Sequence, residues 1–196
     1  MHIGIIGLGK MGNNMRARLR KAGIEVTGYD PNPAVTDVAS LAELAAALPA
    51  PRIVWVMVPS GKITDDVIHD VSDVLEPGDL VIDGGNSRFT DDAIHAEFLA
   101  GKQLGFIDVG VSGGIWGLEN GYGLMAGGDA ADVKRAMPIF DALYRHPTIR
   151  VITVRHEQGA AFMADGYARA TGKPAALLTL PGPGLTNAMT GIGEAF

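Results

Sequence analysis

The sequence predicts an α/β protein built on a single doubly wound, mostly parallel sheet of about eight strands, with helices on both faces. Short apolar runs alternate along the chain with longer segments whose apolar residues recur every three or four positions. The run at residues 53–58 contains no polar residue, as expected for a parallel strand that is covered on both faces. Gly and Pro residues lie at the ends of these segments, where the chain has to turn.

A glycine-rich turn follows the first expected strand, which begins at residue 3. Gly7, Gly9 and Gly12 fit the G-x-G-x-x-G pattern of a dinucleotide-binding, Rossmann-like unit. The first glycine allows the tight turn, the second lets a pyrophosphate approach the backbone, and the third lets the next helix pack close to the strand. The expected cofactor contacts of this turn are Gly7, Leu8, Gly9, Lys10, Met11 and Gly12.

The next helix is expected over residues 13–21, closed by Gly23, and a second strand over residues 24–29. That strand ends at Asp30, close to the spacing of a carboxylate that binds both ribose hydroxyls of a dinucleotide. No Arg follows Asp30, so a 2′-phosphate would meet a negative charge without a cation to offset it. The pattern favours NAD over NADP.

Further elements follow in order. Ser40 and Glu43 form a capping box for a helix over residues 40–48. We expect Ile63, Val67, Val71, Val74 and Leu75 to form the buried stripe of a helix over 62–75, and His69 and His95 to be solvated. Other expected elements are strands at 53–58, 79–83, 105–109 and 124–128, a helix at 91–99, and a helix after Asp129 that Pro138 kinks or splits.

The last fifty residues predict a βαβα segment. Its strands are expected at residues 149–154 and 175–180, and its helices at 158–171 and 185–196. The first of these helices is expected to place Ala160, Met163, Ala164, Tyr167 and Ala168 on one side. We expect the segment to extend the same sheet.

Composition excludes several classes of function. The net charge of −6 without a basic stripe argues against nucleic acid as a partner. The absence of cysteine excludes disulfides, thiolate catalysis and zinc–thiolate sites, and the sequence predicts no metal site. No signal peptide or membrane-spanning run is visible, so a cytoplasmic protein without membrane contact is expected.

Residues 1–144 resemble the N-terminal coenzyme domain of 6-phosphogluconate dehydrogenase, in the β-hydroxyacid dehydrogenase superfamily. The resemblance rests on GLGKMGNNM (7–15), VPSG (58–61), DGGNS (83–87), GVSGGIWGLENGYGLMAGG (110–128) and AMPIFDAL (136–143). Asp30 is similar to the acid of the NAD-preferring branch.

The resemblance implies roles for several of these residues. Val58, Pro59 and Ser60 would pass beside the nicotinamide half of the cofactor, and Asn86 would touch both cofactor and sugar acid. Ser112, Gly113 and Gly114 would hold the carboxylate and hydroxyls of 6-phosphogluconate. In the family, however, a Lys base, an Asn and a Glu acid act from a helical domain after the coenzyme domain, and no matching Lys-x-x-x-Asn follows Leu143.

Residues 147–196 resemble part of the pyrimidine-binding domain of thiamine-diphosphate enzymes of the acetolactate synthase and benzoylformate decarboxylase type. The matching stretch is VRHEQGAAFMADGYARATGKPAALLTLPGPGLTNAMTGIGEA. By this resemblance Glu157 corresponds to the glutamate that contacts the aminopyrimidine ring. Without the diphosphate- and metal-binding domain of those enzymes, we expect Glu157 to be idle and thiamine diphosphate not to bind.

Together the two resemblances indicate a chimera, engineered or recombined, with a seam at residues 143–148. Three functions remain open. The chain binds NAD without a complete catalytic cycle; it is an active decarboxylating 6-phosphogluconate dehydrogenase of the pentose phosphate pathway, with His156 or Lys173 as base; or it is a fold chimera without ligand. Apolar surface left exposed near the seam would favour a homodimer.

Overall fold

The computed structural model describes residues 1–85, 87–144, 156–179 and 183–195. The chain consists of two compact units, Met1–Pro147 and Thr148–Phe196. Each unit is described below by itself.

The first unit is built on one six-stranded sheet with the order β2-β1-β3-β4-β5-β6. Every neighbouring pair is parallel except β5 and β6, which are antiparallel. The strands are β1 (His2–Ile6), β2 (Glu25–Tyr29), β3 (Ile53–Val56), β4 (Leu80–Asp83), β5 (Gly105–Ser112) and β6 (Gly123–Gly128). The order reverses next to β1, so the carboxyl ends of β1 and β3 flank the topological switch point where α/β sheets bind ligands.

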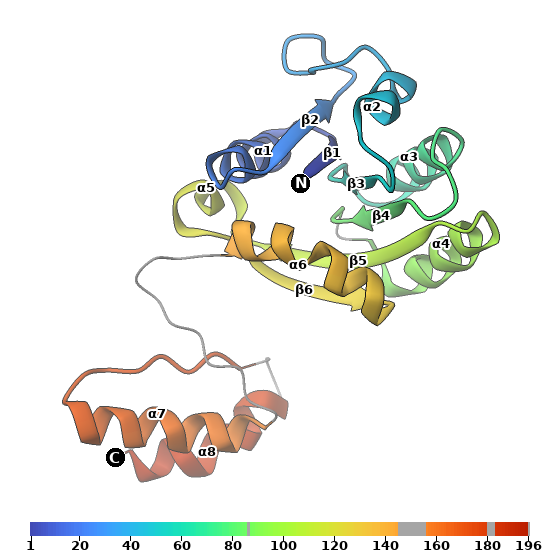
Figure 1. The fold of residues 1–196 in the computed structure, drawn as a ribbon. Helices are drawn as coiled ribbons and strands as arrows, with labels where there is room; N and C mark the ends of the chain where they lie inside the picture. Colours follow the sequence, from blue (N-terminus) through green and yellow to red (C-terminus); the bar gives the residue numbers. More distant parts are fainter. Residues whose placement is uncertain (86, 145–155, 180–182, 196) are drawn as a thin grey trace. The chain divides into compact units, whose positions relative to one another are not determined.

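Helices cover both faces of this sheet, as expected (Figure 1). They are α1 (Lys10–Lys21), α2 (Leu41–Ala47), α3 (Lys62–Ser72), α4 (Phe89–Gly101), α5 (Gly117–Asn120) and α6 (Ala130–Tyr144), with a 3-10 turn η1 (Gly114–Trp116). Pro138 lies inside α6, which remains one helix rather than two pieces.

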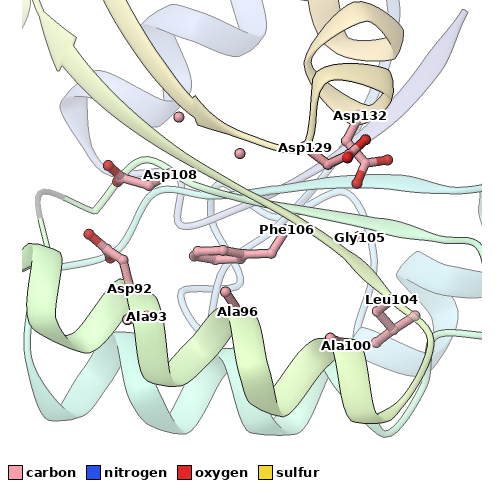
Figure 2. A pocket seen from close by; sticks show the side chains of 12 residues that line it. Asp92, Ala93, Ala96, Ala100, Leu104, Gly105, Phe106, Asp108, Asp129 and Asp132 are labelled. Atoms are coloured by element: carbon pink, nitrogen blue, oxygen red, sulfur yellow. The ribbon is translucent and has the colours of Figure 1, made fainter.

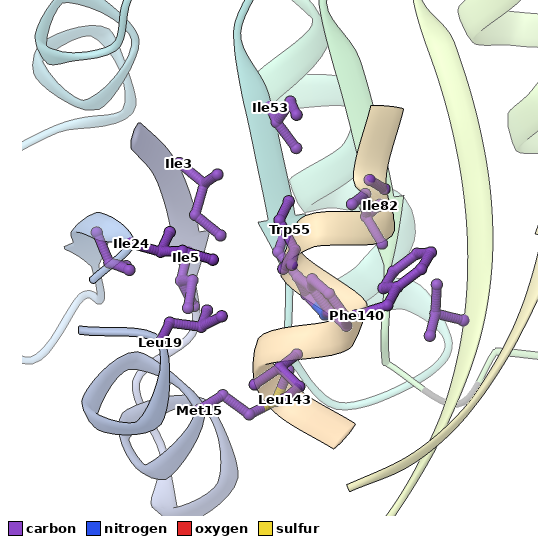
Figure 3. Close-up of a cluster of buried hydrophobic side chains, with 14 of the residues drawn as sticks. Ile3, Ile5, Met15, Leu19, Ile24, Ile53, Trp55, Ile82, Phe140 and Leu143 are labelled. Atoms are coloured by element: carbon purple, nitrogen blue, oxygen red, sulfur yellow. The ribbon is translucent and has the colours of Figure 1, made fainter. Parts of the chain in front are cut away.

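One face of the sheet packs against α1 and α6. Ile5 of β1 and Trp55 of β3 are fully buried there, against Met15 and Leu19 of α1 (Figure 3). Phe140 of α6 meets Trp55 edge to face, with ring centroids 5.9 Å apart. The alternation of side chains along each strand sends the remaining positions to the opposite face.

The opposite face packs against α2, α3 and α4 through the side chains of Ile6, Leu44, Leu48, Val54, Val56, Ile68, Val71, Val81, Leu99 and Leu104. The expected stripe of α3 is wrong at its start, because Ile63 is 52% exposed. The helix instead buries Thr64, Ile68, Val71 and Ser72. The Thr64 hydroxyl can be buried because it donates to the carbonyl oxygen of Pro59 at 3.0 Å.

The strand count differs from the expected eight. Among the described residues the sheet has six strands, all from the first unit. Residues 175–179 form neither strand nor helix, and Leu178 is 96% exposed. The strand expected at 149–154 lies outside the described residues.

The second unit contains two packed helices, α7 (Glu157–Thr171) and α8 (Pro183–Glu194). Ala161 and Ala188 are buried between them, and a Cβ on Gly191 would lie 2.5 Å from Cβ of Ala161. Small residues therefore set the close approach of the two helices. Met163 and Tyr167 stay 49% and 47% exposed, so the side expected for α7 is not its buried side.

Within the described parts of the chain, the helices are too short or too polar to cross a lipid bilayer.

Candidate functional site

The glycine turn after β1 is shaped by contacts with the neighbouring strand. Gly7 has φ +91°, and a Cβ there would lie 2.5 Å from the carbonyl oxygen of Met57. A Cβ on Gly12 would lie 2.0 Å from the carbonyl oxygen of Gly7. Both glycines are therefore required by the protein itself, the first for the turn and the second for helix packing, as the pattern predicts.

Gly9 differs from these two glycines. A Cβ at this position would meet no atom within 4 Å, and the backbone has an ordinary extended conformation. The protein therefore gives no steric reason for glycine here, whereas a ligand lying against the backbone would.

The N-terminus of α1 lies directly at this turn. The helix begins at Lys10, three residues earlier than expected, and no side chain caps it. Its first N–H groups and its positive dipole end are thus available to an anion. This is the arrangement that holds a pyrophosphate in dinucleotide-binding units.

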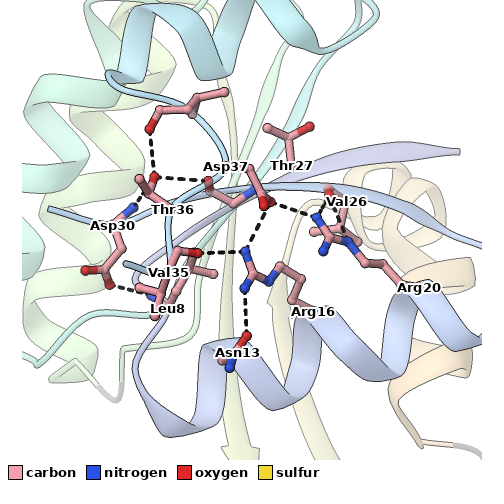
Figure 4. A network of polar contacts seen from close by, with 12 residues as sticks. Leu8, Asn13, Arg16, Arg20, Val26, Thr27, Asp30, Val35, Thr36 and Asp37 are labelled. Atoms are coloured by element: carbon pink, nitrogen blue, oxygen red, sulfur yellow. Dashed lines mark hydrogen bonds and ion pairs between the residues drawn. The ribbon is translucent and has the colours of Figure 1, made fainter. Parts of the chain in front are cut away.

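Asp30 follows β2 and faces the same turn (Figure 4). Its Oδ2 accepts a hydrogen bond from the backbone N–H of Leu8 at 2.7 Å, and its Oδ1 accepts one from Asn32 at 2.8 Å. The backbone N–H of Asp30 donates to Oγ1 of Thr36 at 3.1 Å. The carboxylate is thus held at the end of β2, beside the glycine turn.

A second carboxylate, Asp37, organises the loop after β2 (Figure 4). It accepts from the backbone N–H of Gly28 at 2.8 Å and lies 3.1 and 2.7 Å from the guanidinium nitrogens of Arg16 and Arg20. Partial burial alone would raise the pKa of Asp37, but the Gly28 bond and the two guanidinium groups together lower it. Arg16 is therefore paired within the loop. Spacing along the chain gave no signal for this network, because Asp37 lies in the loop after β2 and Arg16 lies on α1.

The loop after β3 lies against the glycine turn and against the loop after β4. A Cβ on Gly7 would lie 2.9 Å from Cγ1 of Val58, and one on Gly85 would lie 2.8 Å from the carbonyl oxygen of Val58. Pro59 and Ser60 follow in the same loop, before α3. Asn86 lies outside the described residues.

The loop after β5 holds the other expected contacts. Ser112 ends β5, and Gly113 and Gly114 have φ +141° and +51°. A Cβ on Gly113 would lie 2.9 Å from the ring of the buried Tyr122. Because β5 runs parallel to β4, this loop leaves the same edge of the sheet as the loops after β1, β3 and β4.

Asn14 of α1 links the glycine-turn helix to this loop by donating to the carbonyl oxygen of Ile115 at 3.2 Å. The structure thus brings the described predicted residues of the first unit, in the loops after β1, β2, β3 and β5, to one edge of the sheet.

A separate acidic pocket of about 560 Å³ lies where α4, β5, β6 and α6 meet. Figure 2 shows Asp92 and Asp108 on one side of it and Asp129 and Asp132 on the other. Burial, followed by the charges of Asp108 and Asp83, raises the pKa of Asp92 to about 6. Burial also raises the pKa values of Asp108 and Asp132. The predicted dinucleotide contacts do not line this pocket, whose negative charge is unsuited to a phosphate ligand.

His95 corrects the expectation of a solvated histidine. Its side chain is only 5% exposed, and Nε2 lies 2.8 Å from Oδ1 of Asp65 on α3. The partner is 30 residues away on another helix, so helical periodicity within α4 gave no signal for it. His69 is exposed as expected, although its ring packs at a tilt against the ring of Phe98, with centroids 4.1 Å apart.

Glu157, the expected thiamine-family glutamate, is the first residue of α7. Its Oε2 accepts from Nδ2 of Asn187 at 3.2 Å. The pKa of Glu157 is lowered by its own backbone N–H at the helix start and by Asn187. His156 caps the same helix, its Nδ1 accepting from the backbone N–H of Gln158 at 3.2 Å, and Lys173 is exposed after α7.

Two family models match the chain. The model of the NAD binding domain of 6-phosphogluconate dehydrogenase matches residues 2–154. The model of the N-terminal TPP binding domain of thiamine pyrophosphate enzymes matches residues 132–196. The two resemblances seen in the sequence are therefore confirmed.

Curated relatives agree with the first model. The NAD(+)-dependent, decarboxylating 6-phosphogluconate dehydrogenase of Haloferax volcanii is 35% identical over 156 residues, covering 75% of this chain and 51% of its own. The decarboxylating 6-phosphogluconate dehydrogenase of Synechococcus elongatus is 37% identical over 150 residues, covering 69% of this chain and 32% of its own. The chain thus spans about a third to a half of these relatives.

Among solved structures, 3-hydroxyisobutyrate dehydrogenase of Mycobacterium tuberculosis is similar with a TM-score of 0.67 and 29% identity, covering 73% of this chain and 52% of its own. The 6-phosphogluconate dehydrogenase of Plasmodium falciparum shares the fold, with a TM-score of 0.65 and 21% identity, covering 87% of this chain and 41% of its own. The matched model, the relatives and the geometry of the glycine turn agree: over residues 2–154 this chain belongs to the family of the NAD binding domain of 6-phosphogluconate dehydrogenase.

Proposed function

We propose that this chain binds NAD in preference to NADP at the glycine turn, without completing the oxidation of a sugar acid. The observation that carries the proposal is the open backbone at Gly9 beside the uncapped N-terminus of α1. Protein contacts explain Gly7 and Gly12, whereas at Gly9 the turn leaves room for a ligand to lie against the backbone.

The preference for NAD rests on Asp30. Its carboxylate accepts from the backbone N–H of Leu8 in the turn, which places it where the ribose next to the adenine would lie. A 2′-phosphate would add negative charge beside this carboxylate. Arg16, a cation on the adjoining helix, is already paired with Asp37 and bonded to the carbonyl oxygen of Val35 at 3.0 Å.

For the chemistry, we propose that Val58, Pro59, Ser60 and Asn86 take the nicotinamide half of the cofactor, and that Ser112, Gly113 and Gly114 take the substrate. 6-Phosphogluconate is the candidate substrate, because the similar relatives are 6-phosphogluconate dehydrogenases. Proton transfer is the missing part. His156 and Lys173 belong to the second unit and match no family base, and His156 is engaged as the cap of α7.

We also propose that the chain is a chimera, with domains at residues 1–144 and 147–196. Two observations support this: the two family models overlap only over residues 132–154, and the boundary between the two compact units falls at Pro147. In this proposal Glu157 only accepts a hydrogen bond from Asn187 within the second unit, and thiamine diphosphate does not bind.

Self-association is part of the same proposal. Apolar side chains of η1 and α6 in the first unit are left exposed, including Trp116 at 67%, Met137 at 42% and Tyr144 at 39%. Such surface favours a homodimer. Light scattering across a dilution series tests this, and a monomer at every concentration would contradict it.

Calorimetric titration with NAD and with NADP tests the cofactor proposal. The decisive variant is Gly9→Val, because its side chain meets no protein atom at Cβ but would fill the space of the pyrophosphate. We expect Gly9→Val to lose binding while its thermal unfolding stays close to that of the parent. Gly101→Ala, at another glycine with open space around Cβ, is the control and should bind normally.

Three outcomes separate the alternatives. Binding of NAD with no turnover of 6-phosphogluconate supports the proposal. Turnover that is lost on replacing His156 or Lys173 would instead establish an active dehydrogenase. Failure of the folded protein to bind either dinucleotide would establish a fold without ligand.

A further inference from the structure

A buried acidic cluster lies between the sheet and α4, apart from the glycine turn. Asp83 ends β4 and pairs in the sheet with Asp108 of β5. Strand alternation puts both on the face with Val81 and Phe106, toward α3 and α4. Asp92 and His95 lie three residues apart on α4, so they share one side of that helix.

The imidazole of His95 is oriented by Asp65, which lies on α3. The hydrogen bond between Nε2 and Oδ1 of Asp65, at 2.8 Å, places the proton on Nε2, since a carboxylate can only accept. Nδ1 then carries a lone pair. This atom is buried and has no hydrogen-bond partner among the described residues. An unpaired buried acceptor is costly unless another group meets it.

Asp92 and Asp83, the two carboxylates of the cluster, also offer buried oxygen atoms. Oδ1 of Asp92 is buried and also without a partner in the described part of the chain. Asp83 is fully buried, and its oxygens accept from the backbone N–H of Gly85 at 2.8 Å and from Oγ of Ser87 at 2.7 Å. Each carboxylate oxygen can accept more than one bond, so these two bonds orient Asp83 and still leave lone pairs for a further partner.

One ligand atom from each of Asp83, Asp92 and His95 lies within 4.8 Å of the others. We propose that these three residues bind one divalent transition-metal ion, of the Zn²⁺ or Mn²⁺ class, through two carboxylate oxygens and Nδ1 of His95. The Asp65–His95 pair has the arrangement of a carboxylate that orients a metal-binding imidazole. An imidazole nitrogen in the set favours these ions over Ca²⁺ or Mg²⁺, which take oxygen ligands.

The ion would connect α4 to the end of β4. The inference does not depend on dinucleotide binding. An apo protein with an intact glycine turn and a protein that binds no cofactor would both retain the cation site.

The test uses the untagged full-length chain, stripped with a chelator and titrated calorimetrically with ZnCl₂ and, separately, MnCl₂. We expect one ion per chain. His95→Gln and Asp92→Asn should weaken binding at least about tenfold, and Asp65→Asn should weaken it by roughly tenfold through loss of imidazole orientation. His69→Gln and Asp91→Asn are matched controls on exposed or neighbouring positions and should stay within about twofold of the parent, because neither belongs to the ligand set.

A measurement on the parent protein covers the case in which a variant fails to fold. Nitrogen NMR of the histidine side chains should show His95 protonated at Nε2, with Zn²⁺ shifting its Nδ1 and leaving His69 unchanged. No saturable binding of either ion, or binding that survives His95→Gln unchanged, would overturn the proposal. A Zn²⁺ titration that shifts only the exposed histidines would overturn it as well.

Discussion

The carboxylate of Asp30 accepts a hydrogen bond from the backbone N–H of Leu8, over a distance of 2.7 Å. The contact joins the end of β2 to the glycine turn after β1, and that turn flanks the topological switch point of the sheet. It places a negative charge beside a turn whose helix end favours anions. In the proposed dinucleotide site, Asp30 would therefore discriminate between cofactors that differ by one phosphate.

Replacing Asp30 by Asn should shift the preference from NAD toward NADP. Loss of a charged acceptor for the ribose hydroxyls should weaken NAD binding by about tenfold, which corresponds to a hydrogen bond of roughly 1.5 kcal/mol to a charged group. NADP binding should weaken less or improve, because the repulsion of its phosphate is removed. Calorimetry with both dinucleotides measures the ratio. Asp66→Asn, on an exposed carboxylate paired with Lys62, is the control and should leave the ratio unchanged.

Gly12→Ala should destabilise the fold instead of acting on the ligand. Its Cβ would lie 2.0 Å from the carbonyl oxygen of Gly7, and a backbone atom cannot give way as a flexible side chain can. Overpacking of this kind costs about 1–3 kcal/mol. Urea unfolding measures the loss, and Gly9→Ala is the matched control. An equally stable Gly12→Ala protein would show that α1 does not pack closely against the turn.

The architecture of the first unit was readable from the sequence where strands are buried on both faces. Residues 53–56 and 80–82 carry continuous apolar runs, and they lie in the central strands β3 and β4. The expected count of eight strands was too high for the described residues, which form six. Residues 175–179 have the apolar composition of a strand, but a strand forms only when a neighbour pairs its backbone, and composition does not reveal that neighbour.

The candidate site was likewise predicted only in part. The glycines and Asp30 were found because local geometry fixes their spacing. His95 was misjudged because its burial depends on Asp65, which lies on another helix. The α3 stripe failed for a related reason, since the burial of Thr64 depends on a bond to the carbonyl oxygen of Pro59.

Asp79 should be a strong determinant of stability. It is 1% exposed, accepts from the backbone N–H of Arg52 at 2.6 Å, and lies 3.0 Å from Nη1 of Arg52. Asp79→Ala leaves the arginine without this partner and should cost about 3 kcal/mol in urea unfolding. Glu76→Ala removes the exposed partner of the same arginine and should cost less than about 1 kcal/mol. Equal costs would contradict the assigned role of burial.

Asp92 should make stability fall as pH rises. Its folded-state pKa of about 6 lies above the unfolded value of 3.8, so the folded state holds the proton more tightly. That contribution is fully present below pH 3.8 and is lost as pH rises through about 6. Asp92→Asn should therefore raise the melting temperature by about 2–5 °C at neutral pH in the presence of a chelator, and by nothing near pH 4.

Asp37 provides the control of opposite sign for that measurement. Its folded-state pKa is lowered below 3.8, so its contribution is present above this value and is lost as the pH falls through the folded pKa. Asp37→Asn should lower the melting temperature at neutral pH. A melting temperature that rises in both variants would show that general charge reduction, rather than the environment of each group, controls stability.

Gly191→Val should disturb the second unit and leave NAD binding by the first unit unchanged. A Cβ at Gly191 would lie 2.5 Å from Cβ of Ala161, at the closest approach of α7 and α8, so the substitution should push the helices apart. We expect loss of helical signal and earlier proteolysis within residues 157–194, because overpacking costs about 1–3 kcal/mol. Gly193→Val, where a Cβ meets nothing within 4 Å, is the control. NAD affinity should be the same in both variants, since the contacts proposed for the dinucleotide lie in the first unit. A fall in NAD affinity confined to Gly191→Val would show instead that the second unit supports the dinucleotide site, and the proposal of two independent domains would have to be withdrawn.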